Sequence, residues 1–165
     1  MKIYGVDTFT IKDIMAILKN PKNAKLNKEA KQKILTSQKN VQQIVASDRT
    51  VYGINTGFGP LCDVKISEAE TAQLQHNLII SHAVGVGKPI AKDYSRVMMI
   101  AKIHALSKGF SGVSLEVIER LVVMLEKDII PVVPEQGSVG ASGDLAPLAH
   151  LVLPLLGLGK VWQKD

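Results

Sequence analysis

Apolar residues recur every three or four positions along much of the chain, which is the spacing of amphipathic helices. Thr10, a residue type that caps helix starts, precedes the first such stretch, which ends before Pro21 and contains Ile11, Ile14, Met15 and Leu18. A second helix is predicted from Lys28 to Ala46, with inward apolar residues at Ile34, Val41, Ile44 and Val45.

Helical spacing of apolar residues continues further along the chain. Ser67 and Glu70 fit a capping box, in which both side chains satisfy free backbone N–H groups at the start of a helix. That helix should end near Gly85 and present one face made of Leu74, Leu78, Ile79 and His82. The segment between Thr50 and Pro60 contains several glycine and proline residues and is predicted to be a loop or short extended piece.

Two further helices are predicted over 91–108 and 114–127. Gly109 stands at the left-handed stop position of the first, and the second has an inner stripe of Ile118, Leu121, Val122 and Leu125. Pro131 and Pro134 interrupt regular structure, and a last helix is expected to open near Asp144 with Pro147 in its first turn.

No long alternating strand pattern and no internal repeat is present, so we expect a mainly α fold and a single domain over residues 1–165. The composition, 46% hydrophobic and 21% charged, is that of a globular domain. The most apolar stretch, 145–158, is interrupted by prolines, a histidine and a glycine, and is shorter than the roughly 20 residues that span a bilayer. Cys62 is the only cysteine, which excludes an intrachain disulfide and permits a reducing, cytoplasmic location.

Positive charge is concentrated at the N-terminal end. Residues 1–50 carry ten Lys or Arg and four Asp or Glu, whereas the remaining 115 carry ten and eleven. Such a basic region is compatible with nucleic-acid binding, but its lysines are spread over several helical turns without interleaved aromatic residues. We therefore expect a solvated helix face and no nucleic-acid partner.

The most unusual segment is the small-residue loop from Gly137 to Asp144. A phosphate-binding P-loop would need a Gly-Lys-Ser/Thr sequence that is missing here, and a dinucleotide-binding loop would need a preceding strand. A serine-hydrolase turn would need glycine where Asp144 stands. A plain flexible loop remains an alternative on these residues alone.

The tripeptide Ala141-Ser142-Gly143 also permits cyclisation. The Gly143 nitrogen can attack the Ala141 carbonyl carbon with loss of water, and Ser142 can then lose its hydroxyl as a second water. The product would be a methylidene-imidazolone, an electrophile with an exposed CH₂ carbon. Gly143 suits this role because it lacks a Cβ and its nitrogen can approach closely.

Residues 137–150, Gly-Ser-Val-Gly-Ala-Ser-Gly-Asp-Leu-Ala-Pro-Leu-Ala-His, resemble the signature of the aromatic amino acid ammonia-lyases and aminomutases. Two more blocks agree with this family: Tyr52 to Gly59, and Gly109 to Val113. Ser81 to Gly85 and Lys102-Ile103 resemble the branch that acts on histidine. The resemblance covers most of the chain from about Val51 to Gly159 and implies the helical fold shared with fumarase and aspartase.

This resemblance implies roles for individual residues. Tyr52 would be the base that removes a β-proton, and Ala141, Ser142 and Gly143 would form the electrophile, so that no soluble cofactor is needed. His82, Gly59 and Leu78 would contact the substrate, with His82 meeting its imidazole. Asp144 and Asn55 would support the site, with Asp144 either orienting the ring or capping the next helix.

The implied reaction converts L-histidine into trans-urocanate and ammonia in a cytoplasmic homotetramer. Members of the family are much longer than 165 residues, so we expect a fragment that precedes the central helical bundle, is inactive alone and keeps its loop uncyclised. Alternatives are a tyrosine or phenylalanine ammonia-lyase, an aminomutase, or a non-catalytic helical interaction fragment. The four histidines lack the spacing of a metal site, and we expect no protein-bound metal.

Overall fold

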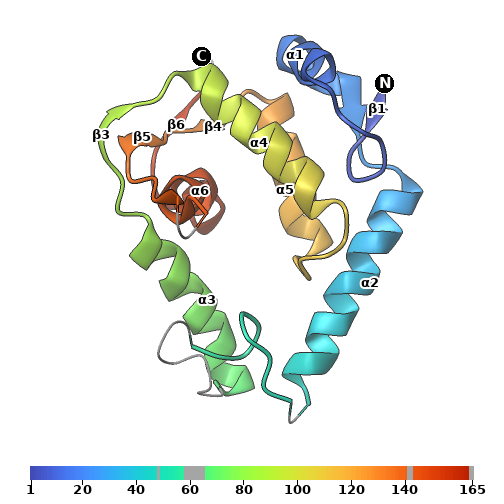
Figure 1. Ribbon diagram of the computed structural model, residues 1–165, viewed down its shortest axis with the longest axis vertical. Helices are drawn as coiled ribbons and strands as arrows, with labels where there is room; N and C mark the ends of the chain where they lie inside the picture. Colours follow the sequence, from blue (N-terminus) through green and yellow to red (C-terminus); the bar gives the residue numbers. More distant parts are fainter. Residues whose placement is uncertain (48, 58–65, 141–142, 164–165) are drawn as a thin grey trace.

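The computed structural model describes residues 1–47, 49–57, 66–140 and 143–163 (Figure 1). This part of the chain forms six α-helices: α1 (Ile11–Lys19), α2 (Lys28–Val45), α3 (Glu68–His82), α4 (Lys92–Leu106), α5 (Leu115–Glu126) and α6 (Leu145–Val152). Their positions agree with the predicted helices to within a few residues, which confirms the mainly α fold. None of these helices is long and apolar enough to cross a membrane.

Very short strands and two 3₁₀ helices complete the described structure. The 3₁₀ helices are η1 (Pro21–Asn23) and η4 (Leu153–Leu156). Strands β1 (Lys2–Ile3) and β2 (Ala24–Lys25) pair in parallel, whereas antiparallel pairs join β3 (Val86–Pro89) to β5 (Pro134–Gln136) and β4 (Ile130–Pro131) to β6 (Val161–Trp162). Strands of this length are too short to produce the alternating pattern by which strands are recognised in a sequence.

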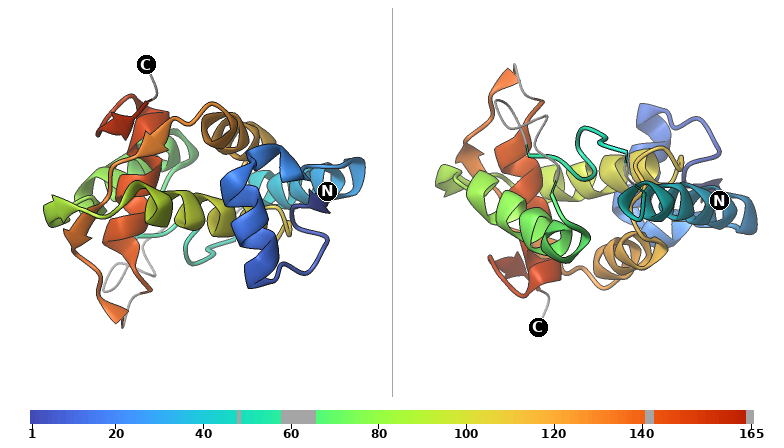
Figure 2. Two further views of the ribbon diagram at one scale, coloured as in Figure 1. Left: turned by 90° about the horizontal axis from the view of Figure 1, so that it is seen from above. Right: turned by 90° about the horizontal axis from the view of Figure 1, so that it is seen from below.

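Helices α4 and α5 pack together and carry half of the residues of the buried core cluster. Views from above and below show α4 crossing the molecule between α1 and α6 (Figure 2). The core side chains of these two helices are aliphatic: Met99, Ile100, Ile103, Ile118, Leu121, Met124 and Leu125. Met124 was not in the predicted stripe of α5, while the predicted Val122 is only half-buried.

The two N-terminal helices begin where the sequence predicts, and the structure shows a side-chain cap at each start. The Thr10 hydroxyl accepts a hydrogen bond from the Asp13 N–H, and the Asp13 carboxylate accepts one from the Thr10 N–H at 2.8 Å. Hydrogen bonds from Thr10 lower the pKa of Asp13 to about 2. Asn27 caps α2 by accepting from the Ala30 N–H at 2.9 Å. Each cap satisfies a backbone donor that the helix itself leaves unpaired.

The cap of α3 differs from its prediction. Ser67 makes no side-chain cap with a backbone N–H, and its hydroxyl instead donates to the Glu70 carboxylate at 2.6 Å. The predicted capping box is therefore wrong at this helix, because the two side chains satisfy each other. Gly109, in contrast, has the predicted left-handed backbone, with φ +76°, directly against the backbone of Lys33.

Candidate functional site

A cavity of about 400 Å³ lies between α3 and α6, with α4 and the segment before α3 completing its wall. We call it the Tyr52 cavity, and its lining residues are Tyr52, Leu78, Ile79, His82, Lys102, Leu145, Leu148, Ala149 and Val152. Tyr52, Leu78 and His82 were singled out from the sequence, and the fold brings all three to one cavity.

Tyr52 is presented by a tight turn. The Ile54 N–H donates to the Val51 carbonyl at 3.1 Å, and Tyr52 itself is 64% exposed. Asn55 is buried beneath this turn; its side-chain oxygen accepts from the Val51 N–H and its amide donates to the Arg49 carbonyl, both at 2.8 Å. Asn55 therefore holds the turn that carries Tyr52 and does not itself line the cavity.

One face of α3 supplies Leu78, Ile79 and His82. The His82 Nδ1 atom lies 2.7 Å from the Leu78 carbonyl oxygen, one helical turn earlier. Because a carbonyl oxygen only accepts, Nδ1 must carry the proton of this hydrogen bond. A neutral His82 then keeps Nε2 as its acceptor nitrogen.

The facing wall comes from α6, through Leu145, Leu148, Ala149 and Val152. These positions follow the i, i+3, i+4, i+7 rule, so they form one stripe of the helix. They were not predicted as site residues from the sequence, although their spacing marks one face of a helix. They make the cavity predominantly apolar.

Lys102 of α4 is the one formally charged side chain among the described residues that line the Tyr52 cavity. It is half-buried, and within the described part its ammonium group makes no hydrogen bond or ion pair. Nearby basic residues of the same helix differ, since Lys92 and Arg96 both bind the Asp128 carboxylate. In the sequence, Lys102 contributed to the resemblance to the branch that acts on histidine, but it was not predicted as a site residue.

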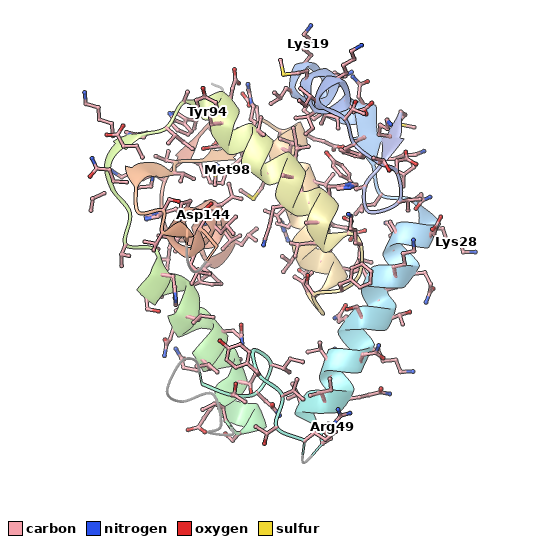
Figure 3. The ribbon with its side chains drawn as sticks, in the orientation of Figure 1. Lys19, Lys28, Arg49, Tyr94, Met98 and Asp144 are labelled. Carbon is pink, nitrogen blue, oxygen red and sulfur yellow. The ribbon has the colours of Figure 1, made fainter. Side chains whose placement is uncertain are left out.

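A second cavity, of about 490 Å³, lies beside the loop before α6. We call it the Asp144 cavity; Lys102 and Leu148 line both cavities, and Ser138, Gly143 and Asp144 line this one. Met98 and Asp144 border it from α4 and from the start of α6 (Figure 3). The two cavities are thus neighbours that share part of their walls.

Asp144 does not cap α6 with its side chain. It has a left-handed backbone, with φ +61°, and its carboxylate accepts a hydrogen bond from the Ser138 hydroxyl. The predicted helix cap is therefore wrong, since this contact joins the two ends of the loop. Gly59, Ala141 and Ser142 lie outside the described residues, so their predicted roles stay predictions.

Two further partly buried imidazoles, those of His104 and His150, accept backbone hydrogen bonds. The His104 Nδ1 atom accepts from the Gly5 N–H at 3.2 Å, and the His150 Nε2 atom accepts from the Gly85 N–H at 3.0 Å. Burial lowers the pKa of both residues, and Lys108 adds to this effect at His104. Within the described ranges, no group of three or more His, Cys, Asp or Glu side chains is placed to hold a metal ion.

The family model of the aromatic amino acid lyases matches residues 9–165. The chain belongs to the aromatic amino acid lyase family. Among its relatives in this family, the histidine ammonia-lyase of Streptococcus sanguinis is 47% identical over 155 residues, and that of Streptococcus pyogenes serotype M3 is 48% identical over 158. These matches cover 94% and 96% of this chain.

Solved structures of the family have the same fold. The crystal structure of histidine ammonia-lyase from Trypanosoma cruzi matches 99% of this chain with a TM-score of 0.84 and 34% identity. The Pantoea agglomerans phenylalanine aminomutase matches 99% with a TM-score of 0.90 and 28% identity. In each case the chain spans about 30% of the relative, namely 30% and 31% of the two streptococcal proteins and 31% and 32% of the two structures.

Proposed function

We propose that this chain is the N-terminal part of a histidine ammonia-lyase, which eliminates ammonia from L-histidine to give trans-urocanate. The observation that carries the proposal is the meeting of Tyr52 and His82 in one largely apolar cavity. The streptococcal relatives, at 47–48% identity, are named histidine ammonia-lyases. A complete enzyme would be a cytoplasmic homotetramer.

Tyr52 is the base of the proposed reaction. As a phenolate it takes a proton from the β-carbon of the substrate while the C–N bond breaks. The C–H electron pair becomes the new double bond, and the amino group leaves as ammonia. The turn held by Asn55 presents Tyr52 at the cavity, so the base is positioned by a buried side chain that does not touch substrate.

His82 selects the substrate. Its Nδ1 atom is engaged by the Leu78 carbonyl, which leaves Nε2 to accept the N–H of a substrate imidazole. Leu78 and the α6 residues supply the apolar walls for the flat ring. A phenyl ring offers no donor to Nε2, so the geometry favours histidine over phenylalanine. A phenol O–H can also donate to Nε2, so the preference for histidine over tyrosine rests on the likeness to the streptococcal relatives.

Residues 141–143 would form the methylidene-imidazolone, which supplies an electrophile that activates the substrate amino group as a leaving group. The described end of this loop fits such a ring. Gly143 has a left-handed backbone with φ +77°, and, its chain neighbours aside, no atom of the described residues lies within 4 Å of where its Cβ would stand. Asp144 holds the loop end through Ser138.

Turnover is best tested in a chimera, because the chain corresponds to only 30% of the S. sanguinis relative. In the chimera this chain replaces the segment of that protein that it matches. We expect release of ammonia and trans-urocanate from L-histidine, and little reaction with L-phenylalanine or L-tyrosine. Preference for either of the latter would replace the proposal with a different member of the family.

The chain alone is the matched control for the chimera. We expect no turnover from it and an intact mass equal to that of the written sequence, since an isolated loop would not be compressed enough to cyclise. A mass lower by two waters would mean that residues 1–165 suffice to build the electrophile. Full turnover by the chain alone would overturn the proposal that it is an incomplete part.

A further inference from the structure

The imidazole of His150 connects helix α6 to the segment that follows α3. The His150 Nε2 atom accepts a hydrogen bond of 3.0 Å from the Gly85 N–H, although the two residues are 65 positions apart. Gly85 follows His82 by three residues, and His150 follows Ala149; His82 and Ala149 both line the Tyr52 cavity. The bond therefore links the end of α3 that carries His82 to the helix that forms the facing wall.

Gly85 fits against His150 because it has no side chain. A Cβ at this position would lie 3.0 Å from the His150 Nε2 atom and 3.2 Å from the Gln136 carbonyl oxygen. The residues after Gly85 form β3, which pairs with β5. The chain beyond Gly85 is thus anchored on β5, and Gly85 itself is anchored on α6.

This contact requires a neutral imidazole, because a protonated ring has two donors and no acceptor. Burial lowers the pKa of His150 and so favours the neutral form. Among the elements packed on α6, α3 faces it with His82 and α4 with Lys102, whereas β4 and η4 carry no titratable side chain. On the side of Gly85, β5 brings Glu135 against Gly87. Within the described part, none of these groups hydrogen-bonds to His150.

We propose that His150 is a positioning residue of the candidate site: its neutral imidazole holds the C-terminal end of α3, and His82 with it, against α6. This inference rests on the proposed function only for the claim that the Tyr52 cavity receives substrate. Above about pH 6.5, the ordinary pKa of histidine, the imidazole is neutral in both folded and unfolded chains and the bond is fully formed. As the pH falls through the lower pKa of the folded protein, the ring takes up a proton and the bond is lost.

Two variants separate the acceptor from the rest of the side chain. His150→Gln can place an amide oxygen near the position of Nε2 and does not titrate, whereas His150→Leu removes the acceptor. Amide hydrogen exchange of Gly85 and Ala83 in the 165-residue chain reads out the contact directly. His104→Leu is the control, since it removes the other imidazole that accepts a backbone N–H, that of Gly5.

Near neutral pH we expect His150→Leu to raise exchange at Gly85 and Ala83 about tenfold, in line with the loss of a partly buried hydrogen bond. His150→Gln should stay within about twofold of the natural chain. Below about pH 6.5 the natural chain should lose protection relative to His150→Gln. Equal exchange in the Leu and Gln variants, or identical pH dependence in the natural and Gln chains, would overturn the inference.

The link to the reaction is tested separately in the chimera. For His150→Leu, the fold increase in KM for L-histidine should be about ten times the fold decrease in kcat. His150→Gln should restore KM. Lost Gly85 protection with an unchanged KM would refute a positioning role and leave the lyase proposal intact. A chimera without any turnover would refute the lyase proposal, while the exchange result would still stand.

Discussion

Helices α3 and α4 are both 15 residues long but have very different surroundings. α4 packs on α1, α5 and α6 and buries Ser95, Met99, Ile100 and Ile103. α3 packs chiefly on α6, and none of its described side chains is fully buried. Length and helical sequence therefore say little about a helix's part in the molecule: α4 belongs to the stable core, whereas α3 forms the wall of a cavity.

This difference predicts that substitutions near α3 affect the reaction, whereas substitutions in α4 affect stability. The surface around α3 also exposes apolar side chains, since Ile80 is 42% exposed and Val84 is 66% exposed. Such residues contribute little to the folding of the described chain and are available to contact other groups.

The largest expected effect is at the proposed base. Tyr52→Phe keeps the ring but removes the phenolic oxygen that, as a phenolate, would accept the β-proton. We expect kcat of the chimera to fall about a thousandfold, within the range of general-base catalysis. Thermal unfolding should change little, because Tyr52 is 64% exposed. Steady-state kinetics with L-histidine decides this, and a variant with near-normal kcat would exclude Tyr52 as the base.

A matched pair of apolar truncations compares the two helices directly. Ile103 of α4 is fully buried, and Ile103→Ala should lower the free energy of unfolding by about 2–5 kcal/mol. Leu78 of α3 is half-buried at the cavity, and Leu78→Ala should cost about 1 kcal/mol. Urea unfolding of the chain measures both values. Equal losses would mean that α3 is part of the stable core.

The helix caps provide a smaller test. Asn27 caps a backbone N–H of α2, so Asn27→Ala should destabilise the chain by about 1 kcal/mol. Among the described residues, the Ser67 hydroxyl bonds to the Glu70 carboxylate and caps no backbone N–H, so Ser67→Ala should cost less than about 0.5 kcal/mol. Urea midpoints compare the two. A larger loss at Ser67 would show that its hydroxyl does cap α3.

The smallest effect is a pH dependence of the N-terminal part. Burial, aided by Lys108, lowers the pKa of His104 in the folded chain, where its Nδ1 atom accepts from Gly5. The stabilisation is present above the ordinary pKa of about 6.5 and is lost as the pH falls through the lowered value. His104→Asn should remove this dependence, because its amide oxygen accepts without titrating. Thermal unfolding of both chains across this range would reveal it, and parallel curves would contradict it.

The sequence predicted the helices well because helical spacing and caps are local properties. Thr10 marks the start of α1, α2 begins at the predicted Lys28, and Gly109 takes the left-handed backbone expected after α4. The two failures, at Ser67 and Asp144, have a common cause. Each side chain hydrogen-bonds to a nearby polar side chain, Glu70 or Ser138, and not to a backbone N–H of the helix. The pattern of a single sequence does not show which of these two partners is favoured.

The sequence by itself determined the order of the helices, the residues able to form an electrophile, and the resemblance on which Tyr52 and His82 were named. Only the tertiary structure decided that Tyr52, Leu78 and His82 share one cavity, that Lys102 borders both cavities, and that His150 binds Gly85. The physical reason is the separation along the sequence over which each pattern acts. Helix periodicity relates residues only three or four positions apart. Which backbone donor meets which imidazole 65 residues away depends on how whole helices pack.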